Sequence, residues 1–102
     1  MIIKFNNNYL EDLAKDTING KPKFDKYVVL KYKKTLKILQ RMPDTKSLWV
    51  LNSLNFEALK GDRKGFFSVR VDYHYRLIFT IEEDLITVSE VITIEELTNH
   101  YQ

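Results

Sequence analysis

The chain has 102 residues, which is enough for one domain and too few for a second hydrophobic core. Its apolar content of 44% and aromatic content of 13% exclude a disordered chain. The lack of cysteine excludes a disulfide scaffold, a thiolate zinc site and a cysteine nucleophile. No signal peptide is recognisable, and no apolar run reaches the roughly 18 residues of a membrane span. We therefore expect a single soluble domain over residues 1–102, located in the cytoplasm and not at a membrane.

The net charge of +2 is distributed unevenly along the sequence. Between residues 21 and 76, 14 basic and 5 acidic side chains give a balance of +9. Residues 77–102 carry 6 acidic side chains and no lysine or arginine, a balance of −6. A basic middle segment favours an anionic partner such as RNA. The alternative is that the lysines only solvate exposed helix faces.

The N-terminal third predicts a strand followed by two helices. Residues 2–5 are apolar enough for a short strand, and the asparagines at 6–8 are good N-cap residues. Helical spacing then continues until Asn19 and Gly20 stop the first helix. The second helix is predicted from about residue 24 to residue 42, before a proline. Its apolar stripe consists of Phe24, Val28, Tyr32, Leu36 and Leu39.

Residues 44–65 have no clear period but are too apolar for a linker, so we expect an irregular packed segment. The residues that follow alternate between apolar and polar over 66–71 and 75–81, and a third β-rich run covers 85–92. Residues 93–102 could extend the last strand or form a helical turn. The order β-α-α-β-β-β predicts an α+β domain with two helices packed on one face of an antiparallel sheet.

The first hairpin of this sheet carries the most informative prediction. If residues 72–74 form its loop, Val71 faces Tyr75 and Arg70 faces Arg76. Two guanidiniums directly opposite each other destabilise a sheet unless an anion lies between them. The pair therefore indicates a phosphate contact. The alternative is that each arginine pairs with an acidic residue of the following strands or extends into solvent.

Two other groups of residues could carry chemistry. Lys60, Arg63 and Lys64 precede the hairpin and either extend its basic surface or form only a solvated turn. His100 and Tyr101 offer an imidazole and a phenol, both suited to proton transfer, unless they are an ordinary frayed end. The histidines and carboxylates lack metal-ligand spacing and no phosphate-binding loop is present, so neither a metal nor a cofactor is expected.

The stretch Leu59–Gly65, followed by Ser68–Val71 and Tyr75–Phe79, resembles the RelE and HigB toxins of type II toxin–antitoxin systems. That family reads Leu-Lys-Gly-Asp, then an aromatic residue, serine and an alternating strand, and after a short turn Tyr-Arg-Ile. The resemblance covers about residues 51–101. It implies a RelE-like fold, a cognate antitoxin, and an mRNA interferase: a metal-free, ribosome-dependent endoribonuclease that inhibits translation.

The resemblance also implies roles for individual residues. Arg76 matches the arginine that contacts the scissile phosphate, and Lys60 matches a basic residue that helps to hold the message. Glu57 matches the position of a catalytic glutamate in YoeB-like members, and His100 with Tyr101 resembles the ending of active nucleases. Residues 76 and 100 are 24 positions apart, more than in YoeB-like toxins, so the sequence leaves open whether His100 reaches the cleft. The predicted RNA-binding residues are Lys60, Arg63, Lys64 and Arg70.

RNA cleavage of this kind needs a base for the 2′-hydroxyl, stabilisation of the phosphorane and an acid for the 5′-oxygen. Arg76 and Lys60, joined by Arg70, would stabilise the charge. Glu57 is the candidate base and His100 the candidate acid, although these two roles could be exchanged. Tyr101 would stack a base or assist proton transfer.

The off-stripe face of the second helix is the predicted antitoxin-binding surface. Apolar contacts are expected from Tyr27, Leu30 and Ile38, and attraction of an acidic segment from Lys33 and Lys37. Two other functions remain open. One is a ParE-like gyrase poison on the same fold, which would lack the terminal histidine and tyrosine. The other is a non-catalytic module that binds RNA or a protein through its basic surface.

Overall fold

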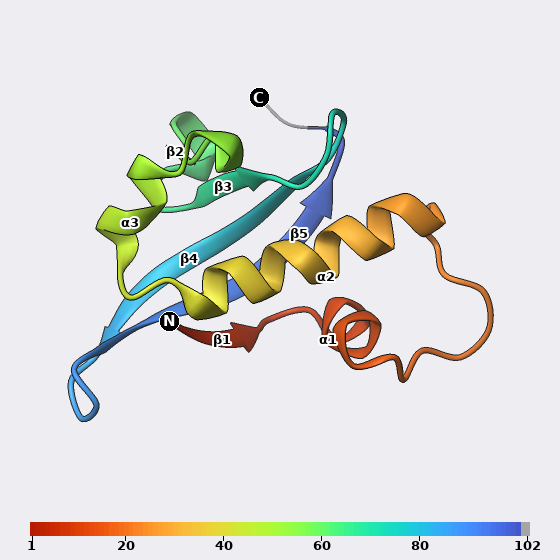
Figure 1. Ribbon diagram of the computed structural model, residues 1–102, viewed down its shortest axis with the longest axis horizontal. Helices are drawn as coiled ribbons and strands as arrows, with labels where there is room; N and C mark the ends of the chain where they lie inside the picture. The colour runs from red at the N-terminus through yellow and green to blue at the C-terminus, as the bar shows by residue number, and fades with distance from the viewer. Residues whose placement is uncertain (101–102) are drawn as a thin grey trace.

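The computed structural model describes residues 1–100, which form a sheet covered by helices (Figure 1). Within these residues the strands are β1 (Ile2–Phe5), β2 (Glu57–Ala58), β3 (Phe67–Arg70), β4 (Arg76–Asp84) and β5 (Ser89–Thr98). The helices are α1 (Asn8–Lys15), α2 (Lys26–Arg41) and α3 (Thr45–Val50), with short 3-10 turns η1 (Asn52–Leu54) and η2 (Gly61–Arg63). The sheet has the order β1-β5-β4-β3-β2, with β1 parallel to β5 and the other neighbours antiparallel. The predicted α+β class is confirmed.

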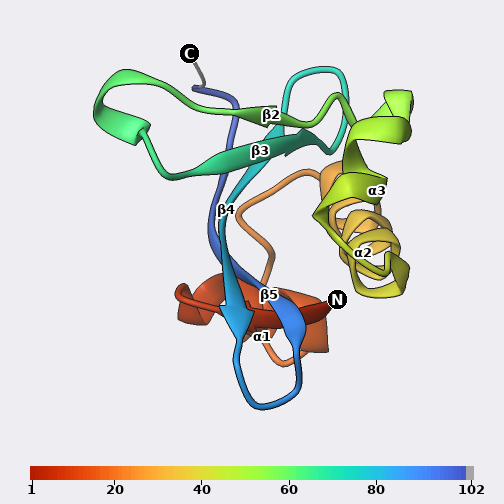
Figure 2. The ribbon, with the colours of Figure 1, turned by 90° about the vertical axis from the view of Figure 1, so that its left-hand side faces the viewer.

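Side chains from the helices and from one face of the sheet form a common core. The helices contribute Leu10, Leu13, Val28, Tyr32, Leu36, Leu39 and Leu48. The strands contribute Val69, Leu77, Phe79, Ile92, Ile94 and Leu97. Figure 1 shows α2 running across β4 and β5, and Figure 2 shows α2 and α3 on the same side of these strands. The opposite face of the sheet carries no α-helix in the described residues, and this open face is where the polar residues of interest lie.

The apolar stripe predicted for the second helix is confirmed. Four of its members are buried within the helix: Val28, Tyr32, Leu36 and Leu39. The helix begins at Lys26 because the side chain of Asp25 caps it, accepting a hydrogen bond from the Tyr27 backbone N–H at 2.8 Å. Phe24 therefore precedes the helix, where its ring packs edge-on against Tyr75 at 5.8 Å between centroids.

Tyr32 connects α2 to α1 inside the core. Its side chain is fully buried, and its hydroxyl donates a hydrogen bond to the carbonyl oxygen of Leu10 at 2.7 Å. Burial disfavours the phenolate and raises the pKa of Tyr32 well above its ordinary value. The neutral hydroxyl is thus part of the packed core rather than a titrating group near neutrality.

One predicted helix boundary and one predicted irregular segment differ from the structure. The first helix ends at Lys15, not at Asn19, because Asp16 adopts a left-handed conformation (φ 59°) and its N–H bonds to the carbonyl of Asp12. The segment 44–65 is more regular than expected, since it contains α3 and the two-residue strand β2. The structure therefore has one helix more than the two predicted, over the residues that it describes. Elements this short show no hydrophobic period from which to predict them.

The predicted register of the β3–β4 hairpin is confirmed. Arg70 is paired with Arg76, and the N–H of Val71 donates to the carbonyl of Tyr75 at 2.9 Å. The loop 72–74 is held by the Asp72 carboxylate, which accepts hydrogen bonds from the backbone N–H groups of His74 and Tyr75 at 2.9 and 2.7 Å. The alternation of the two strands with their hairpin loop was therefore enough to place the arginines.

The long β4–β5 hairpin determines where the C-terminal part of the chain lies. Residues 93–98 extend β5, which answers the question left open by the sequence. One extra residue, Glu95, interrupts the ladder: Phe79 pairs with Ile94, but Ile78 pairs with Glu96. After this bulge, Thr98 is the partner of Arg76. Figure 2 shows the end of β5 on the side of β2 and β3, far from the β4–β5 turn.

Candidate functional site

The open face of the sheet brings together residues from separate strands. One row across β2, β3, β4 and β5 consists of Glu57, Ser68, Ile78 and Glu96. The adjacent row consists of Arg70, Arg76 and Thr98. Directly paired residues place their side chains on the same face, with Cβ atoms about 4.5–5.5 Å apart. Glu57 and Arg76, predicted from the sequence as catalytic residues, therefore flank Ser68 on one face.

Arg76 is buried to an extent unusual for a charged residue, with only 6% of its surface exposed. Its Nε donates to the Ser68 hydroxyl oxygen at 3.0 Å, and its Nη2 donates to the same oxygen at 2.8 Å. Nη2 also donates to the backbone carbonyl of Asn55 at 2.5 Å. The guanidinium is thus directed diagonally across β3, toward Ser68 and the segment before β2. These bonds fix a positive charge at the base of the open face.

Arg70 has different surroundings from Arg76 despite the shared register. It is exposed and lines a shallow groove beside α2, together with Lys31 and Lys34. Because Arg76 is directed toward Ser68 instead, the structure does not indicate one phosphate clamped by both guanidiniums. The phosphate contact itself remains a prediction, and Arg76 is the arginine that lies beside the other candidate catalytic residues.

The predicted RNA-binding cations also separate into two groups. Lys60 is exposed and borders the same shallow surface as Glu57, and Lys64 is exposed at the end of η2. Arg63 forms an ion pair with Glu96 at 2.9 Å, in which both side chains are partly exposed. This carboxylate offsets the charge that Arg63 would offer to RNA. Of these cations, Lys60 is the nearest to Glu57 in the sequence and borders the same surface.

The end of β5 leads the chain back toward Arg76. Thr98 is paired with Arg76, and the hydroxyl of Thr98 accepts a hydrogen bond from the His100 N–H at 2.9 Å. His100 itself is exposed. Its separation of 24 residues from Arg76 reflects the length of the β4–β5 hairpin, which returns the backbone to the level of that arginine. Tyr101 lies outside the described residues.

The residues predicted to contact an antitoxin divide between exposed and packed positions. Tyr27 is 73% exposed and Leu30 is 56% exposed on α2. Ile38 is half-buried and packs against the core, so it offers less surface to a partner than Tyr27 or Leu30, and its contact with an antitoxin stays a prediction. It lies one turn further along α2 than Lys34, at the edge of the groove that Arg70 lines.

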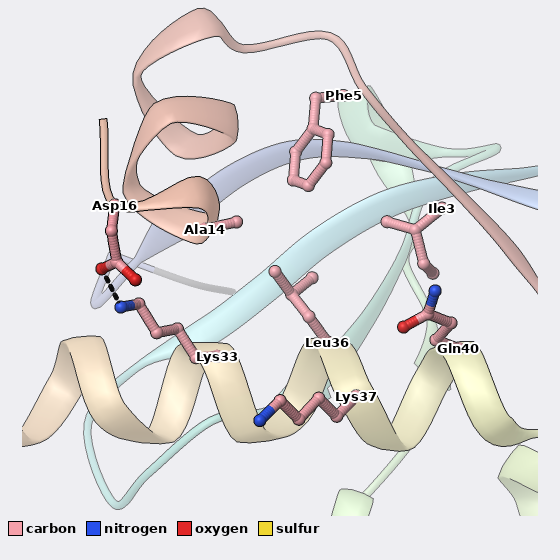
Figure 3. Close-up of a pocket in the computed structure, with 8 residues that line it drawn as sticks. All are labelled: Ile3, Phe5, Ala14, Asp16, Lys33, Leu36, Lys37 and Gln40. Carbon is pink, nitrogen blue, oxygen red and sulfur yellow. Dashed lines mark hydrogen bonds and ion pairs between the residues drawn. The ribbon is translucent and has the colours of Figure 1, made fainter. Parts of the chain in front are cut away.

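Lys33 and Lys37 border a different groove, between α1, β1 and α2 (Figure 3). Its floor is formed by apolar residues: Ile3, Phe5, Ala14 and Leu36. At its rim Lys33 forms an ion pair with Asp16, whereas the side chain of Lys37 lies alongside (Figure 3). Neither Tyr27 nor Leu30 lines this groove.

The sequence placed Ser68 in the family motif but indicated no role for Ser68 or Asn55, which provide acceptors for Arg76. The strand alternation contained a signal for Ser68, since it places Ser68 on the same face as Arg70. Nothing in the sequence pointed to Asn55, because the acceptor is its backbone carbonyl. Within residues 1–100, no three histidine, aspartate or glutamate side chains come together as a metal site would require.

Comparisons with known proteins concern the fold and the family of the chain. Solved structures of bacterial toxins share the fold. A YoeB/ParE toxin from Agrobacterium tumefaciens has a TM-score of 0.63 at 18% identity and covers 99% of this chain and 100% of its own. YafQ from E. coli has a TM-score of 0.54 at 19% identity and covers 96% of this chain and 91% of its own.

A YoeB–YefM complex from Staphylococcus aureus has a TM-score of 0.60 at 25% identity, with coverage of 99% and 98%. No curated protein matches the sequence. The family described as the RelE-like toxin of the type II toxin-antitoxin system HigB matches residues 3–91. The chain therefore belongs to the HigB-like toxin family. None of the helices in residues 1–100 is long and apolar enough to cross a membrane.

Proposed function

We propose that this toxin is a metal-free endoribonuclease that cleaves messenger RNA on the ribosome and so inhibits translation. The proposal is carried by one observation: Glu57 and Arg76 flank Ser68 on the open face of the sheet, where the backbone of β5 also returns. RNA transesterification requires a general base, a group that stabilises the phosphorane and a general acid. Glu57 offers a carboxylate and Arg76 a fixed guanidinium. His100, two residues beyond Thr98, offers an imidazole.

In the proposed reaction, Glu57 takes the proton from the 2′-hydroxyl, and the 2′-oxygen attacks the adjacent phosphorus. Arg76 stabilises the negative charge of the phosphorane, the role in which a preorganised donor contributes roughly 10²–10³ in rate. The bond from phosphorus to the 5′-oxygen then breaks, and His100 protonates that oxygen. The products are a 2′,3′-cyclic phosphate and a 5′-hydroxyl. For Tyr101 the proposed role is to stack a base of the message or to assist proton transfer.

The shallow form of the site supports dependence on the ribosome. Glu57 and Lys60 border an open surface rather than a deep cleft, and Arg63 is already paired with Glu96. Such a surface positions a flexible message poorly, and positioning can account for a large part of a catalytic barrier. We therefore assign the orientation of the message to the ribosome, with Lys60, Lys64 and Arg70 as contacts to its phosphates.

We further propose that a cognate antitoxin binds α2. The exposed side chains of Tyr27 and Leu30, surrounded by lysines, suit a segment that combines apolar and acidic residues. Lys33 and Lys37 border the groove of Figure 3 and would bind a second part of the same partner. The proposal of an antitoxin partner is supported by the solved YoeB-YefM toxin-antitoxin complex from Staphylococcus aureus, a structural relative of this chain.

In the deciding experiment, expression of the wild-type chain or of Arg76→Ala is induced in bacteria, and the 5′ ends of transcripts are mapped. We expect growth arrest with new ends inside translated messages for the wild type, and neither for Arg76→Ala. Arg41→Ala, which removes an exposed arginine at the end of α2, is the charge-matched control and should keep the toxicity. Circular dichroism verifies that each variant folds.

Other outcomes would overturn the proposal. Growth arrest without new transcript ends would instead favour a gyrase poison. A wild-type chain that causes no arrest would favour a binding module. Cleavage of naked RNA at the rate seen on programmed ribosomes would contradict the ribosome dependence alone.

A further inference from the structure

We infer that Ser68, together with the backbone of Asn55, is a positioning device that holds the Arg76 guanidinium for catalysis. The inference rests on the proposed nuclease function and adds residues with no assigned role in it. It begins from an asymmetry in the sheet. Arg70 and Arg76 are direct partners in the ladder, yet Arg70 is exposed and Arg76 is buried. The bonds to Ser68 and Asn55 draw Arg76 inward and so account for this difference.

The hydroxyl of Ser68 is placed to accept two hydrogen bonds from one guanidinium. It lies 3.0 Å from Nε and 2.8 Å from Nη2 of Arg76, and the side chain of Ser68 is fully inaccessible to solvent. Two bonds from adjacent nitrogens to a single oxygen fix both the position and the plane of the guanidinium.

Asn55 completes the arrangement from outside the sheet. Its carbonyl oxygen accepts a hydrogen bond from Nη2 at 2.5 Å. Asn55 is a non-glycine residue in the left-handed region (φ 46°), at the end of η1. Asparagine tolerates this conformation better than most residues. The backbone therefore turns at Asn55 in a way that aims its carbonyl at Arg76 just before β2 begins.

These bonds determine the orientation in which the guanidinium meets the substrate. Ser68 anchors the group through Nε and Nη2, and Asn55 anchors Nη2 from a second direction. An arginine held from two directions presents its charge to the phosphate in one orientation. Because a displacement of about 1 Å can cost on the order of 100-fold in rate, loss of the Ser68 bonds should slow chemistry more than it weakens RNA binding.

The test compares Ser68→Thr with Ser68→Val, two side chains of nearly equal shape that differ in the hydroxyl. Single-turnover cleavage of ribosome-bound message is measured at saturating and subsaturating ribosome concentration, below the unfolding temperature of each variant. We expect Ser68→Thr to keep most of the rate. Ser68→Val should lose roughly 10- to 100-fold in the maximal rate, with less than about a threefold change in half-saturation.

A second measurement separates positioning from folding. In Arg76→Ala, millimolar guanidinium ion, well below denaturing concentration, should restore part of the cleavage by occupying the space between Ser68 and Asn55. The double variant Arg76→Ala with Ser68→Val should show no such restoration. The Nε–H signal of Arg76, followed by NMR in the otherwise wild-type chain, should shift or broaden in Ser68→Val and be retained in Ser68→Thr.

The outcomes test the positioning role of Ser68 and the nuclease function separately. Equal rates for Ser68→Val and Ser68→Thr, with full dependence on Arg76, would overturn the positioning role and leave the nuclease intact. An Arg76→Ala variant that is folded and as active as the wild type would overturn the proposed function itself. If both serine variants fail to fold, guanidinium rescue of Arg76→Ala alone decides: absence of any rescue would contradict the inference.

Discussion

The two faces of the sheet are built on different principles. The helix-covered face buries aliphatic and aromatic side chains whose contribution is area removed from water. On the open face, Ser68, Arg76 and Thr98 are buried although they are polar or charged. Buried polar groups are tolerated only when they are hydrogen-bonded, and no buried side-chain nitrogen or oxygen in residues 1–100 lacks a partner. One face therefore stabilises the fold, and the other fixes the geometry of a few polar groups.

The largest effect on stability is expected from the covered face. Phe79 is fully buried, and its ring stacks near Phe56 and Phe67 at 6.1 and 6.4 Å between centroids. Phe79→Ala should lower the free energy of unfolding by about 3–5 kcal/mol because it leaves a cavity. Urea unfolding followed by circular dichroism measures this, with the exposed Leu85→Ala as a matched control. A loss below about 1 kcal/mol would contradict this view of the core.

The next largest effect is expected from a residue of the open face, and it should change the rate of cleavage without changing stability. Glu57→Gln keeps the shape of a half-buried side chain but removes the proposed base. We expect single-turnover cleavage on ribosomes to fall by roughly 10²–10⁴-fold, the range of general base catalysis. The unfolding midpoint should change little. If cleavage persists at the wild-type rate, Glu57 is not the base and His100 becomes the candidate for that role.

Tyr32 of α2 packs in the core on the covered side of the sheet, but it buries a polar group, as residues of the open face do. Tyr32→Phe removes its bond to Leu10 and should cost about 1 kcal/mol of stability at neutral pH. The raised pKa of Tyr32 means that its contribution is complete below the unfolded value of about 10 and declines as pH rises toward the folded value. At a pH above about 10, unfolding measurements should therefore show a smaller difference between Tyr32→Phe and wild type. A difference that grew with pH would contradict this.

The smallest effect is expected from the ion pair of Arg63 and Glu96, which joins η2 to β5 at the surface. Partly exposed pairs contribute about 0–1 kcal/mol and are screened by salt. Glu96→Gln should leave stability nearly unchanged but release Arg63 toward RNA, giving a modest increase in affinity for ribosome-bound message at low salt. An unchanged salt dependence of binding would show that Arg63 does not contact the message.

The sequence predicted those features that depend on repeated patterns. The stripe of α2 and the pairing of Arg70 with Arg76 each follow from periodicity, and both are found in the structure. The short elements α3 and β2 were missed because six and two residues contain no full period. The separation of the two arginines was missed for another reason. It depends on a diagonal bond to Ser68 and a backbone carbonyl of Asn55, neither of which pairwise register describes.

The single bulged residue in β5 sets the parity of everything that follows it. Ile94 faces the core, and in an uninterrupted strand residue 96 would face it too, with Leu97 on the open side. The extra residue, Glu95, reverses this order, so that Leu97 is buried against Leu77 and Thr98 lies beside Arg76. Without the bulge, the same residues in a regular strand would place Glu96 in the core instead of Leu97 and would bring the chain toward His100 from the other face. This one bulged residue thus determines both which side chains fill the core and which residues lie beside Arg76.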